Sequence, residues 1–123
     1  MAMTAPDAEV ERVELAPAAA LFRSLGDPAR LMIVRCLARG PARVTDLTAV
    51  LGLAQSTVSK HLACLRDCGL VTSTPAGRAS MFRLAAPALA DMLTAAETVL
   101  AATGNAVALC PEFGLDACGT RPS

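Results

Sequence analysis

Glycine divides the first half of this chain into short segments whose apolar residues recur at helical spacing. Asp27 followed by Pro28 is a typical helix start, with a capping side chain and a proline in the first turn, and Gly40-Pro41 is a typical stop. Gly52 and Gly69 stand where a left-handed residue commonly ends a helix. The pattern predicts four helices: one that ends at Leu25, and three over residues 28–39, 45–51 and 55–68.

The rest of the pattern predicts a hairpin and one long helix. LVTSTPAGRASMFRL, residues 70–84, alternates weakly and is expected to fold back around Pro75-Ala76-Gly77. Pro87 then opens a helix that ends at Gly104 and carries an apolar stripe from Leu89 to Leu100. That stripe is long for a chain of 123 residues, so we expect it to form a dimer surface.

Composition and charge set further limits. Apolar residues make up 54% of the chain and aromatic residues only 2%, which favours a helical core. We expect no membrane span and a cytoplasmic location. Residues 15–83 carry a net charge of +6, while residues 1–14 and 84–123 each carry −3. We expect a flexible acidic arm over 1–14, a domain over 15–104 and a mobile tail over 105–123. The basic middle could face a polyanion or be ordinary solvated charge.

The helix over residues 55–68 divides into three faces. Its core face contains Val58, Leu62 and Leu65. The opposite face has short hydroxyls and one cation, which suit close approach to base edges and phosphates. Together with the preceding helix and the hairpin, this predicts a mainly α winged helix-turn-helix fold of five helices and a two-stranded wing. A generic helical pair with a solvated face is the alternative. The expected DNA contacts are Gln55, Ser56, Thr57, Ser59, Lys60, His61 and, at the wing tip, Arg78.

The segments FRSLGDPARLMIVRCL, VTDLTAVLGLAQSTVSKHLACLRDCGLV and GRASMFRL resemble the ArsR/SmtB winged-helix repressors over roughly residues 17–103. The resemblance is specific because the Leu-Gly-Asp-Pro-x-Arg opening and the Gln-Ser-Thr-Val-Ser-x-His-Leu helix occur together and in order. It implies a homodimer built from the first and last helices. It also implies that double-stranded operator DNA is bound and then released when a toxic metal ion binds, with no organic cofactor.

The cysteines indicate the class of metal ion that would bind. There are five, an odd number, and we expect no export signal, so reduced thiols are expected rather than a disulfide framework. Thr45 stands where the family's arsenic-type site has a cysteine, and the last helix lacks the histidines of the zinc-type site. Cys64-Leu-Arg-x-Cys68 instead resembles the cadmium- and lead-sensing branch. That resemblance implies a third thiol from the tail, by position Cys110, with Cys118 as a possible extra ligand. We expect Cd²⁺ or Pb²⁺ as effector, with As(III) and Zn²⁺ as alternatives.

The chemistry agrees with this assignment. Residues at i and i+4 on a helix have Cβ atoms about 5–6 Å apart, so two thiolates can converge on one soft cation, and a third sulfur would close a trigonal site. His61 with Cys64 and Cys68 could bind zinc without the tail, although a structural or phosphate-contact role is favoured. Cys36 lies within a packed helix and is expected to be a small buried hydrophobe.

Three other functions compete with a metal-released repressor. One keeps the DNA binding and makes the thiols a redox switch, which requires activated thiolates. Another is a metal-sequestering protein without a DNA role. An enzyme is the least favoured, because one histidine and no paired carboxylates leave no nucleophile and base to assign.

Overall fold

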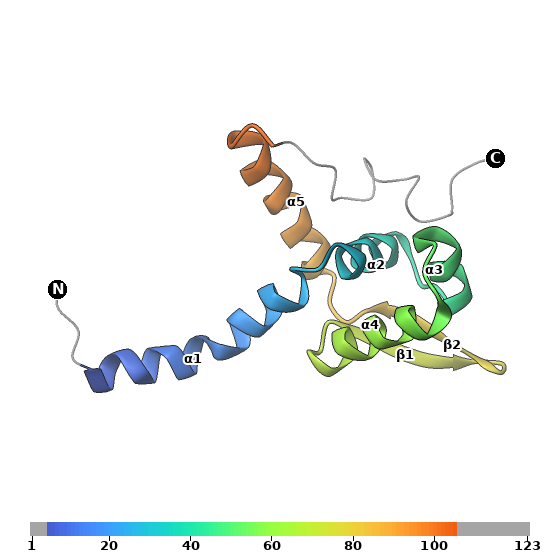
Figure 1. Ribbon diagram of the computed structural model, residues 1–123, viewed down its shortest axis with the longest axis horizontal. Helices are drawn as coiled ribbons and strands as arrows, with labels where there is room; N and C mark the ends of the chain where they lie inside the picture. Colours follow the sequence, from blue (N-terminus) through green and yellow to red (C-terminus); the bar gives the residue numbers. More distant parts are fainter. Residues whose placement is uncertain (1–4, 106–123) are drawn as a thin grey trace.

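A computed structural model describes residues 5–105 (Figure 1). Its elements, in chain order, are α1 (Ala5–Ser24), α2 (Pro28–Arg39), α3 (Val44–Leu51), α4 (Gln55–Asp67), β1 (Val71–Ala76), β2 (Ala79–Leu84) and α5 (Ala88–Ala102). The two strands form one antiparallel hairpin. The predicted class, mainly α with five helices and a two-stranded wing, is confirmed.

The core lies where α2, α3, α4 and the hairpin meet. Its fully buried side chains are Ile33, Val34, Leu47, Val58, Leu62, Leu65 and Val71. The loop before α3 forms an isolated β-bridge with the hairpin, since Ala42 and Phe82 exchange two backbone hydrogen bonds of 3.0 and 2.8 Å. Leu89 and Leu93 attach α5 to the same cluster. This packing fixes α4 against α3 and the wing behind it.

The predicted helix boundaries in this body are confirmed. The Asp27 carboxylate caps α2 by accepting a hydrogen bond of 3.1 Å from the Arg30 backbone N–H. Gly52 and Gly69 adopt the left-handed conformation, with φ of 69° and 76°, after α3 and α4. A side chain at either glycine would be strained, so the α3–α4 and α4–β1 connections depend on these residues.

Two expectations need correction. The acidic segment expected to be an unpatterned arm up to Glu14 is helical from Ala5 onward, because α1 runs without a break to Ser24. The side chains from Glu9 to Ala19 are exposed, so no buried stripe marked this helix in the sequence. The wing turn is also displaced. Its two central residues are Gly77 and Arg78, while Pro75 lies within β1 opposite Ser80.

Helices α1 and α5 leave the body in different directions (Figure 1). Both expose large apolar side chains: Val13 and Phe22 of α1 and Val99 of α5 are each more than half exposed. An apolar cavity of about 230 Å³ opens at their base, between Leu21 of α1 and Met92 of α5. The helices of residues 5–105 are all too short or too polar to cross a membrane. The tail expected over 105–123 lies, beyond Asn105, outside the described residues.

Candidate DNA-binding and metal-binding helix

Helix α4 shows the three faces that its sequence predicts. Val58, Leu62 and Leu65 are buried against the core. On the opposite face Ser56, Ser59 and Lys60 are exposed, and Gln55 is exposed at the first turn. The exposed hydroxyls and the lysine therefore form a small polar surface on the second helix of a helix-turn-helix.

The wing carries a second exposed cation. Arg78 is exposed at the two-residue turn between β1 and β2. Behind it, the Arg83 Nη2 donates a hydrogen bond of 3.3 Å to Thr74 Oγ1 across the two strands. The wing thus presents guanidinium groups beside a body of net positive charge, as expected of a surface that contacts phosphates.

The remaining face of α4 holds the two thiols. Cys64 is half-buried, and Cys68 is exposed at the C-cap, where its backbone N–H bonds to the Cys64 carbonyl at 3.1 Å. Both are free thiols, one helical turn apart. Cys36, by contrast, is 4% exposed inside α2, as expected of a buried hydrophobe.

The thiol of Cys68 contacts the end of α1. Its Sγ lies 2.8 Å from the Ser24 Oγ, in a hydrogen bond for which either atom could be the donor. Ser24 is 4% exposed, so this hydroxyl is buried at the junction of α1 and α4. Sequence reasoning missed Ser24, because nothing in the sequence brings a helix-terminal serine together with a cysteine 44 positions later.

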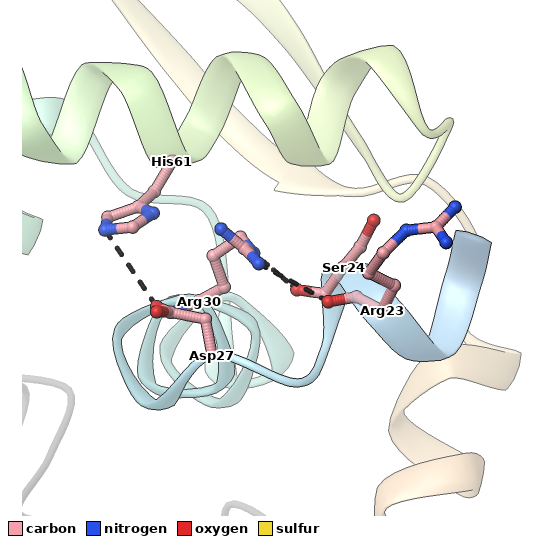
Figure 2. A network of polar contacts seen from close by, with 5 residues as sticks. All are labelled: Arg23, Ser24, Asp27, Arg30 and His61. Atoms are coloured by element: carbon pink, nitrogen blue, oxygen red, sulfur yellow. Dashed lines mark hydrogen bonds and ion pairs between the residues drawn. The ribbon is translucent and has the colours of Figure 1, made fainter. Parts of the chain in front are cut away.

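The turn between α1 and α2 has further polar contacts with its surroundings (Figure 2). The Arg30 Nε donates to the Ser24 carbonyl at 2.5 Å, and its Nη2 lies 3.4 Å from the Arg23 carbonyl. The His61 Nε2 of α4 lies 3.9 Å from the Asp27 Oδ2, an ion pair when the imidazole is protonated. Helices α1, α2 and α4 are therefore joined at one point.

Asp27 is the anion at this junction. The hydrogen bond from the Arg30 backbone N–H holds the pKa of its carboxyl below the ordinary value, while desolvation acts in the opposite direction. The charges of His61 and Arg30 lower the same pKa further. Since His61 is turned toward Asp27, its structural role is the one that the geometry favours over the zinc-ligand alternative.

Two thiols are the soft donors that α4 supplies. Among residues 5–105, three or more His, Cys, Asp or Glu side chains nowhere gather into a group that could hold a metal ion. Cys110 and Cys118, the expected tail ligands, lie outside the described residues. A three-sulfur site at Cys64 and Cys68 would thus need a ligand from beyond Asn105 or from a second chain.

Comparison with known proteins supports the DNA-binding interpretation. Residues 27–73 match the model of the arsR family of bacterial regulatory proteins. The chain is 39% identical over 88 residues to the HTH-type transcriptional regulator NmtR of Mycobacterium tuberculosis, covering 72% of this chain and 73% of NmtR. It is 47% identical over 75 residues to the HTH-type transcriptional regulator CmtR of Mycobacterium bovis, covering 61% of this chain and 64% of CmtR.

A solved structure shows the same fold. The homodimeric winged helix-turn-helix DNA-binding domain of Mb0332 from Mycobacterium bovis, a possible ArsR-family regulator, superposes with a TM-score of 0.70 at 24% identity. The match covers 84% of this chain and 93% of that one.

Proposed function

Because this chain belongs to the arsR family of bacterial regulatory proteins, we propose that it is a metal-released transcriptional repressor of the cytoplasm. Its homodimer binds double-stranded operator DNA when metal-free and leaves it when a soft thiophilic ion, Cd²⁺ or Pb²⁺, binds Cys64 and Cys68. The observation that carries this proposal is the position of both thiols on α4, whose opposite face presents the exposed hydroxyls and Lys60.

The DNA-binding half of the proposal is supported by the shape of the polar surface. Ser56, Ser59 and Lys60 protrude from a helix that α3 and the core hold in place, as the recognition helix of this fold requires. Arg78 would reach a neighbouring phosphate from the wing. Phosphate contacts of this kind give affinity, and short side chains near base edges give sequence preference.

The exposed apolar side chains of α1 and α5 support the homodimer. The apolar side chains of both helices are exposed in the single chain, and an apolar cavity lies at their base. Apolar surface of this extent is removed from water most readily by a second copy, since identical helices present the same complementary face. Two recognition helices would then be held at a fixed separation for two half-sites.

The metal-binding half is supported by donor chemistry. Thiolates favour soft ions over Mg²⁺ or Ca²⁺, and among residues 5–105 no third His, Cys, Asp or Glu side chain completes a group with these two. The third thiol is Cys110 from the tail. The end of α4 lies next to the base of α5, where the Ala85 N–H bonds to the Leu70 carbonyl at 2.9 Å. Four residues lie between Asn105 and Cys110, so a tail from the same subunit could run back at most about 18 Å, which is less than the length of about 22 Å of the 15-residue α5. The partner's tail avoids this constraint.

Metal binding then changes the fit to DNA. Drawing a tail onto the end of α4 would reorient the two recognition helices of the dimer relative to each other. A coupling of about 1–3 kcal/mol, which is typical of allosteric proteins, lowers operator affinity by up to about 150-fold. That range is sufficient to switch a promoter.

The test is an operator-release assay across a panel of Cd²⁺, Pb²⁺, Zn²⁺, As(III) and Hg²⁺, repeated with Cys110→Ser and Cys118→Ser. We expect release by Cd²⁺ or Pb²⁺ at stoichiometric ion, with loss of release in Cys110→Ser. Absence of operator binding by the metal-free protein would identify a metal-sequestering protein instead. Release by peroxide, without stoichiometric metal binding by the reduced thiols, would identify a redox switch.

A further inference from the structure

The last turn of α1 is held from two sides. On one side the Arg30 guanidinium of α2 donates to the carbonyls of Ser24 and Arg23 (Figure 2). On the other side the Ser24 hydroxyl faces α4 and lies 2.8 Å from the Cys68 sulfur. The carbonyl and the hydroxyl of one buried serine therefore connect α1 to two different helices.

A buried hydroxyl requires a hydrogen-bond partner, and here Cys68 supplies it. Either group can be the donor, which allows two arrangements: the thiol can donate to the Ser24 oxygen, or the hydroxyl can donate to the sulfur. Both hold the Cys68 side chain toward the α1–α2 turn. The position of this sulfur is thus set by a residue of α1 as well as by α4.

Metal binding removes one of these arrangements. When a soft ion binds Cys68, the S–H bond breaks, a sulfur–metal bond forms and the proton passes to water. The sulfur then has no hydrogen to donate, so the contact survives only if the Ser24 hydroxyl turns to donate to the thiolate. A hydrogen bond to a charged sulfur is stronger than one to a neutral thiol, so Ser24 contacts the two states unequally.

We propose that Ser24 is a positioning residue of the metal site. It orients the Cys68 sulfur and transmits the effect of metal binding to the end of α1. The proposal rests on the metal-released repressor function described above. It assigns to α1, a helix with exposed apolar side chains, a direct polar link to the metal-binding thiol. The link acts through Cys68 and makes no contact with the ion.

The test compares Ser24→Ala with Ser24→Thr, which keeps a hydroxyl, and with Thr94→Ala, which removes a hydroxyl that bonds only within α5. Operator affinity is measured for each dimer with and without stoichiometric Cd²⁺, and ion binding is followed by sulfur-to-metal charge-transfer absorption. We expect metal-free Ser24→Ala to bind operator as the unsubstituted protein does, and to bind Cd²⁺ with lower affinity because the hydrogen bond to the thiolate is lost. Its metal-induced loss of operator affinity should be about fivefold smaller, as for the loss of one hydrogen bond. Ser24→Thr should show the same metal-induced loss of operator affinity as the unsubstituted protein. Thr94→Ala should show it as well.

A second measurement needs no variant at Ser24. The amides of Leu25 and Gly26 close the last turn of α1 by bonding to Leu21 and Arg23. Their hydrogen exchange in the unsubstituted dimer should change when Cd²⁺ is added and should stay unchanged in Cys68→Ser.

The outcomes separate the two proposals. If the unsubstituted dimer is released by Cd²⁺ and Ser24→Ala is released to the same extent, the role of Ser24 is wrong and the repressor function stands. The role of Ser24 would also be wrong if Ser24→Ala lowered metal-free operator affinity by the same factor as it lowered the metal-induced change in that affinity. Such a result would show a purely structural role. An unsubstituted dimer that no metal releases would overturn both.

Discussion

The two polar faces of α4 carry different candidate functional side chains. Cys64 and Cys68 lie on a face that shares no residue with the exposed set Ser56, Ser59 and Lys60. A substitution on one face should therefore leave the property of the other unchanged.

Replacement of either thiol should abolish the metal response alone. Cys64→Ser and Cys68→Ser remove a soft ligand while keeping a side chain of similar shape, so metal-free operator affinity should stay within about twofold of that of the unsubstituted protein. Release by Cd²⁺ should be lost, because two remaining thiols close no trigonal site. Mobility-shift titrations with and without Cd²⁺ measure both properties. A parallel loss of DNA binding in both variants would contradict the division of faces.

Asp27 should affect stability through its charge. Asp27→Ala removes the cap of α2 and should lower the free energy of unfolding by about 1 kcal/mol at neutral pH. Because the pKa of this carboxyl is lowered by folding, its contribution is present above the ordinary pKa of about 4 and is lost as the pH falls through the lowered value. Urea unfolding at several pH values measures this. Asp27→Asn, which can still cap without a charge, is the control and should lack the acid-dependent part.

At the scale of elements, α4 and the wing together form the DNA-contacting unit of the proposed repressor. The sequence predicted both elements because their signals are local: periodic apolar residues, capping residues and glycines with positive φ. The sequence predicts the turn around Pro75-Ala76-Gly77 because Pro75 is a frequent turn residue, yet here it is tolerated inside β1 of a two-stranded sheet.

The exposed lysine of α4 should set part of the salt dependence of binding. Lys60→Ala should weaken operator binding at every metal level, and the slope of log affinity against log salt concentration should fall by about one. Fluorescence anisotropy at several salt concentrations measures the slope. Arg12→Ala removes another exposed cation, one that lies on α1, and should change neither quantity. An equal effect of both substitutions would point to net charge rather than to a contact.

Across the whole molecule, the parts that the sequence left undetermined are those whose partners lie outside the local segment. The side chains from Glu9 to Glu14 are exposed, so the sequence pattern there predicts an arm where the chain forms part of α1. The contact between Ser24 and Cys68 depends on how α1 meets α4 in space. That Cys64 and Cys68 lie on one side of α4 was predictable, because i, i+4 spacing on a helix determines proximity.

Assembly should depend on the apolar side chains that α1 and α5 expose. Phe22→Asp and Val99→Asp place a charge on those surfaces and should weaken dimerisation by about tenfold or more. Sedimentation equilibrium over a concentration series measures this. Leu53→Asp, at an exposed apolar position in the α3–α4 connection, is the control and should leave the dimer intact. If neither helix substitution shifts the equilibrium, the partner surface lies elsewhere.

The attachment of α1 at one end makes it a lever. Its 20 residues extend about 30 Å from the turn that Ser24, Asp27 and Arg30 anchor, so a tilt of about 10° at the anchor moves the far end by roughly 5 Å. A small displacement at the buried Ser24 is thereby amplified at the N-terminal end of α1. Truncation of α1 from its N-terminal end would shorten this distance and leave the contacts of Ser24, Asp27 and Arg30 in place.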